Sequence, residues 1–145
     1  IYAIHVIEHL QAPQYVFEKC AQALKKGGQV YFMTPNAESS ALKIFKDKWW
    51  NLEDPTHIRF FSQQSVTLML EKAGFTDVKV TIPRWDSLTI EANSVMRAFS
   101  KSSQHGVLSG KIGLLAILAL FPFFLLLRFP WRNISPSIEI TATKA

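Results

Sequence analysis

The sequence lacks a second cysteine and has few charged residues. Cys20 is the only cysteine among the 145 residues, so no disulfide can form within the chain. Only 19% of the residues are charged, whereas 48% are hydrophobic and 12% aromatic, which excludes an intrinsically disordered chain. No tandem repeat or low-complexity tract is present. These absences predict a folded domain held by an apolar core, without crosslinks.

Acidic residues are missing from the segment between Ala92 and Ile138. This segment carries the whole excess of positive charge, in five residues: Arg97, Lys101, Lys111, Arg128 and Arg132. It also holds the longest uncharged apolar run, residues 112–127. Basic charge beside apolar surface is typical of contact with anionic lipid, whereas nucleic-acid sites interleave cations with stacking aromatics. We therefore expect no nucleic-acid partner, and either contact with a membrane surface or cations that flank a buried helix.

Strand and helix patterns alternate in the remainder of the chain. Apolar runs predict four strands: Ile1–Ile4, Gln29–Thr34, Asp77–Ile82 and Ile138–Thr143. One amphipathic helix is expected from Pro13 to Gly27-Gly28, and a second from Ser62 to Gly74. This order predicts an α/β fold with right-handed crossovers. Residues 37–61 show no regular pattern.

Residues 84–135 form a hydrophobic, basic helical insertion between the last two predicted strands. The 16 uncharged residues of its apolar run are interrupted by Pro122 and fall short of the roughly 17–25 that a membrane-spanning helix needs. We expect two helices that form a lipid-facing platform, with Arg128 and Trp131 as an interfacial anchor. A hydrophobic lid over the substrate and a dimer interface are the alternatives, and the sequence leaves the oligomeric state open.

His5, Glu8 and His9 match, letter for letter, the H-x-x-E-H pattern of inverted zinc peptidases. That chemistry requires both histidines on one helical face, with Glu8 as general base. The motif directly follows an apolar run and precedes a helix that begins at Pro13, which places it in a turn. A zinc metallopeptidase is therefore an alternative function, and a non-enzymatic membrane-anchored module is another.

Several segments in order resemble the class I S-adenosylmethionine-dependent methyltransferases: HVIEHL-QAP, ALKKGGQVYFMTPN, DPTHIRFFSQQSVTLMLEKAGF and the terminal IEITATK. They are most similar to the branch that includes ubiquinone-biosynthesis O-methyltransferases. The resemblance implies a Rossmann-like sheet of seven strands, of which this chain holds the C-terminal half, from the end of the fourth strand through the antiparallel last strand. It also implies S-adenosylmethionine as cofactor, bound across the carboxyl ends of the strands. The implied reaction is methyl transfer to a small-molecule or lipid-linked acceptor, at oxygen, with carbon and nitrogen as alternatives.

Two parts of the family pattern are absent: the Gly-rich loop after the first strand and the acidic residue that holds the cofactor's ribose. The only glycine pair, Gly27-Gly28, is expected to cap a helix. We therefore expect residues 1–145 to be a partial methyltransferase domain, the C-terminal part of a longer protein, inactive alone. The expected location is the cytoplasm, in association with the inner face of the membrane.

The resemblance also implies roles for individual residues. His5 and Val6 would bind the cofactor, and Asn36, Trp50 and Phe60 would bind the acceptor. His57 and His9 are the catalytic candidates, with His57 as a general base on the acceptor hydroxyl or as a residue that orients it. Glu8 and His9 are the candidate ligands of a divalent metal.

Each of these residues also has a structural interpretation. Glu8 could cap the helix that follows, and His9 could hydrogen-bond to the backbone. Asn36 could form a turn, and His57 could be a loop histidine bonded to the backbone. Aromatic residues such as Trp50 and Phe60 are common in cores.

Overall fold

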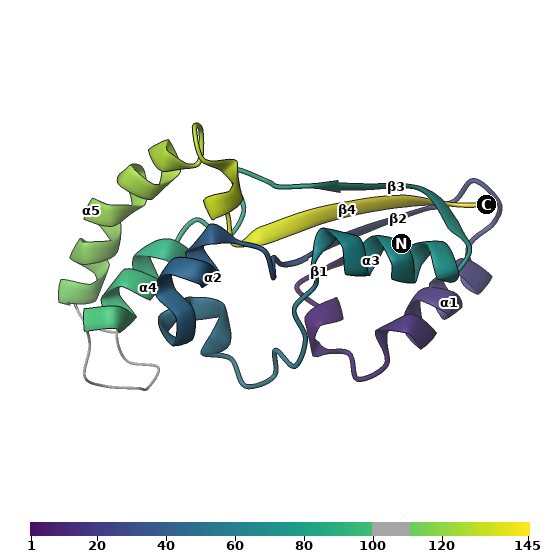
Figure 1. Ribbon diagram of the computed structural model, residues 1–145, viewed down its shortest axis with the longest axis horizontal. Helices are drawn as coiled ribbons and strands as arrows, with labels where there is room; N and C mark the ends of the chain where they lie inside the picture. The colour runs from purple at the N-terminus through teal and green to yellow at the C-terminus, as the bar shows by residue number, and fades with distance from the viewer. Residues whose placement is uncertain (100–110) are drawn as a thin grey trace. The chain divides into compact units, whose positions relative to one another are not determined.

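The computed structural model describes residues 1–99 and 111–145, which divide into two compact units (Figure 1). The first unit comprises Ile1–Ala37, Thr56–Ile82 and Ser137–Ala145. The second comprises Glu38–Pro55 and Pro83–Pro136. Lys101 and the side chain of Lys111, two of the five cations singled out above, lie outside the described residues.

The first unit contains one four-stranded sheet, which confirms the α/β fold class. Its strands are β1 (Tyr2–Ile4), β2 (Gln29–Pro35), β3 (Phe75–Thr81) and β4 (Ser137–Lys144), in the order β1-β2-β4-β3. β1 runs parallel to β2, and β4 is antiparallel to both of its neighbours. The closing antiparallel pair is therefore present, with Val80 opposite Ile140. A register shift between Thr76 and Lys79 interrupts this pair where Asp77 takes a φ of 51°.

Two helices of the first unit, α1 (Pro13–Ala23) and α3 (Gln63–Lys72), pack on the sheet through a shared core. Phe17 from α1 and Leu70 from α3 are fully buried with the strand residues Val30 and Ile140. α3 begins where it was predicted, because the Ser62 side chain accepts a hydrogen bond from the backbone N–H at position 65, in a capping box. The other face of the sheet, called the open face below, is partly exposed: Thr81 and Thr141 on it are exposed, whereas Met33 is buried.

The open face and one edge of the sheet have distinct chemistry. On the open face, the hydroxyls of Tyr31 and Thr81 donate to the Glu139 carboxylate at 3.0 and 3.2 Å. At the edge, β1 pairs only with β2, and the side chains of Tyr2 and Ile4 are exposed. An exposed apolar edge strand can still accept a pairing partner.

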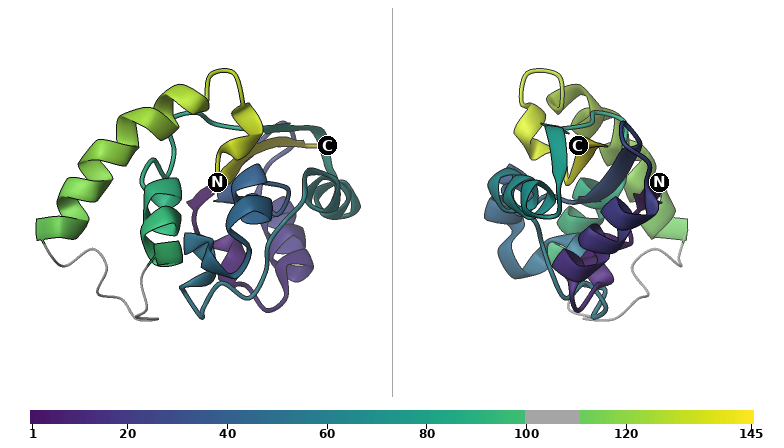
Figure 2. Two further views of the ribbon diagram at one scale, coloured as in Figure 1. Left: turned by 60° about the vertical axis from the view of Figure 1, so that its left-hand side comes forward. Right: turned by 90° about the vertical axis from the view of Figure 1, so that its right-hand side faces the viewer.

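The second unit is helical, with α2 (Ser40–Phe45), α4 (Ile90–Phe99) and α5 (Lys111–Leu127). α4 and α5 pack side by side (Figure 2). Three short 3₁₀ turns complete the unit: η2 (Lys46–Lys48), η3 (Trp50–Leu52) and η4 (Arg132–Ile134). In the part of the chain that the structure covers, none of the helices has both the length and the hydropathy to cross a membrane.

α2 is absent from the sequence-based expectations, which treat residues 37–61 as irregular. The helix has only six residues, and its N-cap is Ser39, whose Oγ accepts from the backbone N–H of Ala41 at 3.1 Å. Contacts within the unit bind this segment to α4: the Trp50 N–H donates to Ser94 Oγ at 2.9 Å. So short a helix leaves too few apolar positions for a helical period to show.

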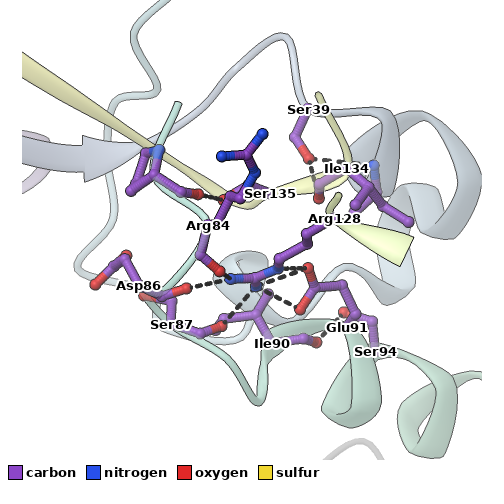
Figure 3. Close-up of polar contacts among 12 residues, drawn as sticks. Ser39, Arg84, Asp86, Ser87, Ile90, Glu91, Ser94, Arg128, Ile134 and Ser135 are labelled. Carbon is purple, nitrogen blue, oxygen red and sulfur yellow. Dashed lines mark hydrogen bonds and ion pairs between the residues drawn. The ribbon is translucent and has the colours of Figure 1, made fainter. Parts of the chain in front are cut away.

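Arg128 is not an interfacial anchor, which corrects one expectation. Its side chain is fully buried and forms a two-pronged ion pair with Glu91, in which Nε donates to Oε1 and Nη2 to Oε2, both at 2.8 Å (Figure 3). Its remaining N–H groups donate to the carbonyls of residues 84, 86 and 87. A guanidinium offers five donors in a planar fork, so this one side chain joins the end of α5 to α4 and to the loop before it.

Candidate functional site

The chain leaves the sheet sharply at the carboxyl end of β1. The N–H of His5 donates to the Met33 carbonyl at 2.9 Å, which extends the parallel pairing by one residue. His5 itself has a φ of 51°, in the left-handed region, and the short helix η1 then covers only Ile7–His9. His5 and His9 are therefore not on one continuous helix. The geometry that an inverted zinc peptidase requires is absent, and this alternative is not favoured.

Glu8 is a buried carboxylate at the centre of this turn. Its exposed fraction is 0%, and Thr34 Oγ1, near the end of β2, donates to Oε2 at 3.0 Å. Oε1 has no well-formed hydrogen bond among the described residues, and it lies 3.3 Å from His5 Nδ1 and 4.0 Å from His57 Nε2. Glu8 does not cap α1, because the N-cap position is Ala12 and no side chain caps it. The structural interpretation of Glu8 as a helix cap is therefore wrong.

Glu8 remains ionised despite its burial. Burial alone would raise the pKa of this carboxyl group, but the nearby His5 imidazole and the hydrogen bonds from the backbone and Thr34 together outweigh it and hold the pKa below the ordinary value of 4.5. The site therefore contains a fixed negative charge within reach of imidazole groups at neutral pH.

The depressed pKa of Glu8 predicts an acid-dependent loss of stability. Its contribution to the free energy of unfolding is complete above the unfolded-state pKa of about 4.5 and is lost as the pH falls through the lower folded-state pKa. Urea unfolding of the wild type and of Glu8→Gln, measured from pH 7 to pH 3, should show a difference that shrinks toward acid. Parallel pH profiles for the two proteins would contradict an ionised Glu8.

His9 is held by the loop that contains His57. Nδ1 of His9 lies 3.0 Å from the carbonyl oxygen of Thr56, and a carbonyl can only accept, so Nδ1 carries the ring proton and Nε2 offers a lone pair. The rings of His9 and His57 are 4.8 Å apart, and the ring of Phe60 meets His57 edge-on at 6.1 Å. The predicted backbone bond of His9 is present, and it leaves the second ring nitrogen available for chemistry.

Arg59 hydrogen-bonds this loop to the turn after β1. Its backbone N–H donates to the Glu8 carbonyl at 3.2 Å, and its guanidinium donates to the carbonyls of Leu10 and Gln11 at 3.0 and 2.7 Å. Arg59, Thr34 and Thr56 are not among the residues that the sequence predicts for the site. Their roles depend on main-chain contacts across the fold, for which the sequence offers no signal.

Glu8, His9 and His57 each offer a ligand atom, and these atoms lie within 4.8 Å of one another. Two nitrogens and a carboxylate oxygen suit zinc and similar cations. Ligand bonds of about 2.0–2.1 Å place such atoms roughly 3.3 Å apart around a tetrahedral ion, so the widest separation would have to shrink by about 1.5 Å. The donor types are those that a metal binds, whereas the present spacing is wider than a bound ion requires.

The candidate acceptor-binding residues differ in burial and in the unit to which they belong. Asn36 follows β2, is fully buried, and pairs with Phe61 in a parallel bridge. Phe60 lines an open pocket of about 350 Å³ together with Pro13 and Met69. Trp50 belongs to the second unit, in η3. The first unit thus holds Asn36 and Phe60 but not Trp50.

The candidate cofactor-binding residues lie where β1 ends. Val6 is 45% exposed, and His5 is partly exposed beside the Glu8 carboxylate. In open α/β sheets, ligands bind beyond the carboxyl ends of the strands. The structure therefore gathers His5, Val6, Glu8, His9 and His57 at the edge of the sheet where this rule predicts a ligand.

Solved structures share this fold. The chain aligns over 99% of its length with a SAM-dependent methyltransferase from Archaeoglobus fulgidus, at 21% identity and a TM-score of 0.56. It aligns over 99% with phosphoethanolamine N-methyltransferase 2 of Haemonchus contortus, determined with S-adenosyl-L-methionine, at 14% identity and a TM-score of 0.56. The [4+2]-cyclase SpnF matches over 99% of the chain, at 17% identity and a TM-score of 0.50. The chain spans 57%, 32% and 48% of these proteins respectively, and the cyclase shows that the fold alone does not fix the reaction.

Sequence comparison identifies the family. No curated protein sequence matches the chain significantly. A family model described as a methyltransferase domain matches residues 1–80, more than half of the chain, which include β1, β2 and the whole cluster of histidines around Glu8. With the fold, the sheet order and this match in agreement, the chain belongs to the methyltransferase-domain family.

Proposed function

We propose that the intact protein transfers a methyl group from S-adenosylmethionine to a hydroxyl group of a small-molecule or lipid-linked acceptor. The observation that carries the proposal is the buried Glu8 carboxylate with His9 and His57 around it, at the carboxyl ends of β1 and β2. Family membership supports methyl transfer, and the related proteins named above as SAM-dependent, or determined with that cofactor, support the methyl donor.

The residues present at the end of β1 fit part of such a cofactor. Val6 offers an exposed apolar side chain, and His5 lies beside a fixed negative charge that favours a cationic ligand. S-adenosylmethionine, when bound, would supply a methyl group that is already activated by a sulfonium leaving group. The protein then has to align the acceptor, exclude water and remove the acceptor's proton.

His9 is the group that we assign to proton removal. The Thr56 carbonyl fixes its tautomer, so Nε2 is the atom that would accept the proton of a hydroxyl acceptor. His57 lies near both His9 and Glu8, and the carboxylate would stabilise positive charge that develops on either ring. A neutral amine has a lone pair without losing a proton, whereas a hydroxyl group needs a base. The cluster therefore favours oxygen over nitrogen as the methylated atom.

We also propose that cofactor binding needs chain beyond these 145 residues. The chain spans only part of its structural relatives, and no Gly-rich loop follows a strand in its sequence. The exposed side chains of Tyr2 and Ile4 along the free edge of β1 support the addition of a further strand. The H-x-x-E-H turn supports a place in the ubiquinone-biosynthesis O-methyltransferase-like branch.

Binding of a divalent metal is an alternative role for the same cluster, because Nε2 of His9 cannot bind an ion and accept a proton at the same time. Glu8, His9 and His57 would hold it, with the Thr56 carbonyl orienting His9 from behind. Calorimetric titration with Zn²⁺ should show one site that disappears in His57→Ala and remains in Cys20→Ala. Equal zinc binding by His57→Ala would show that the ion binds elsewhere.

Methyl transfer itself is tested with a labelled cofactor. The intact protein is incubated with S-adenosylmethionine carrying a tritiated methyl group and either an alkyl phenol or the matching alkylamine. The proposal predicts label in the phenol ether and little in the amine. Label in the amine alone would contradict oxygen transfer but not the family. No transfer to either compound, with the cofactor bound, would contradict the proposed hydroxyl acceptor.

A further inference from the structure

α5 presents an apolar surface to solvent over half of its circumference. Its exposed positions recur at helical spacing and contain no polar residue: Leu114, Leu115, Leu118, Ala119, Pro122, Phe123 and Leu126. Leu118 is 61% exposed and Leu126 is 69% exposed. The opposite side of the helix is also apolar and packs inward, with Phe124 buried. We refer to the seven exposed positions as the α5 face.

A helix in contact with water on one side ordinarily carries polar residues there. Each large apolar side chain that is removed from water contributes about 1.5–3 kcal/mol, so leaving several of them exposed on one stripe forgoes a substantial stabilisation. A contiguous apolar surface of this kind is typical of a binding site for a protein or a membrane.

Aromatic and basic residues lie where α5 ends. The guanidinium of Arg84 lies 5.3 Å from the ring centroid of Phe129, and the ring of Trp85 meets that of Phe129 edge-on at 6.2 Å. Trp85 is 65% exposed, and Trp131 and Arg132 are exposed as well. Arg84 is only partly exposed, and its Nε is buried without a hydrogen-bond partner among the described residues. Tryptophan beside cations at the end of an apolar helix is the arrangement found at membrane–water interfaces.

We propose that the α5 face binds the surface of a bilayer that contains anionic lipid. The helix would lie in the plane of the interface, with the leucines in the acyl region and Arg84 and Arg132 at the headgroups. The 17 residues of α5 and the buried Arg128 near its end argue against a spanning orientation.

Charge argues for lipid over a second copy of the chain. No acidic residue occurs between Ala92 and Ile138, so two α5 faces in a symmetric dimer would bring cations together without acids from this segment to balance them. Two of the five cations in the segment are neutralised internally, because Arg128 pairs with Glu91, and Arg97 pairs with Glu53 at 2.8 Å. Of the other three cations, Arg132 is exposed just after the end of α5, next to Trp131.

The test is flotation of the intact protein with vesicles of phosphatidylcholine alone or with phosphatidylglycerol added. The triple variant Leu115→Ser/Leu118→Ser/Leu126→Ser should bind anionic vesicles at least about tenfold more weakly, because each leucine loses apolar contact. Arg84→Gln and Arg132→Gln should each weaken binding about fivefold at low salt. Leu68→Ser is the matched control, since Leu68 is 58% exposed on α3 in the first unit and should leave flotation unchanged.

Each outcome decides the proposal. Flotation with anionic vesicles that is lost in the triple variant and kept in the control supports it. Circular dichroism checks that the triple variant, whose substitutions are all exposed, retains the helix content of the wild type. Equal flotation of the triple variant overturns the proposal, as does failure to float at low salt. A dimer in sedimentation that dissociates in the triple variant, without flotation, would assign the α5 face to self-association.

Discussion

Replacing Arg128 by methionine should lower the free energy of unfolding by about 3–5 kcal/mol, the largest effect on stability that we expect from one substitution. The methionine fills similar space but leaves Glu91 fully buried without its partner. It also leaves three main-chain carbonyls, those of residues 84, 86 and 87, without the donors that now satisfy them. Urea unfolding of the wild type and the variant measures the difference.

The pH dependence of this effect identifies its cause. Burial raises the pKa of Glu91, and the Arg128 charge opposes that rise. Without Arg128 the pKa of Glu91 rises further, so the folded variant is most stable when Glu91 is protonated and loses stability as the pH rises through the folded-state pKa. The difference between variant and wild type should therefore be smaller at pH 5 than at pH 8.

Two controls distinguish a lost ion pair from a packing defect. The double variant Arg128→Met/Glu91→Leu removes the unpaired charge and should recover much of the stability. Arg97→Met breaks the more exposed pair with Glu53 and should cost only about 1 kcal/mol. An equal loss in Arg97→Met and Arg128→Met, or no recovery in the double variant, would contradict the role assigned to Glu91.

Replacing His9 by glutamine should lower the rate of methyl transfer to a hydroxyl acceptor by about 10²–10⁴-fold. The glutamine amide can still donate to the Thr56 carbonyl, but it has no group that accepts a proton near neutral pH. The acid limb of the rate–pH profile, which reports loss of the free base, should disappear with it. Binding of S-adenosylmethionine should be unaffected.

His57→Gln tests whether the two histidines act together. If His57 only supports His9, this variant should retain the acid limb while its rate falls. Leu68→Ser, exposed on α3, should leave the rate unchanged. A His9→Gln variant with the rate and pH profile of the wild type would remove His9 from the mechanism.

The strands were predictable from the sequence because the α/β core depends on local apolar runs. Two short apolar segments illustrate this: Gln29–Thr34, which is followed by Pro35, and Ile138–Thr143. These two segments pair in the sheet as expected. α3 was predictable for the same reason, with Ser62 and Gly74 marking its ends. The helix α2 and its packing with α4 were not, because they depend on tertiary contacts rather than on a local period.

The candidate site was predictable in its residues but not in its geometry. The motif of His5, Glu8 and His9 can be recognised in the sequence. The left-handed backbone at His5 is needed to show that it forms a turn rather than a helix. The burial of Glu8 against Thr34 depends on two strands meeting, which no sequence pattern encodes. The prediction that Arg128 is an interfacial anchor was wrong for a related reason. A cation beside an apolar run gives the same sequence pattern whether its side chain faces lipid or pairs with a buried carboxylate.

Calorimetric titration of S-adenosylmethionine into the intact protein tests the central claim, that the carboxyl ends of β1 and β2 form a methyl-donor site. We predict saturable binding of one cofactor per chain, weakened in Val6→Lys, which places a cation where the cationic cofactor should lie, and unchanged in Leu68→Ser. Absence of binding, or equal binding by Val6→Lys and the wild type, would contradict it.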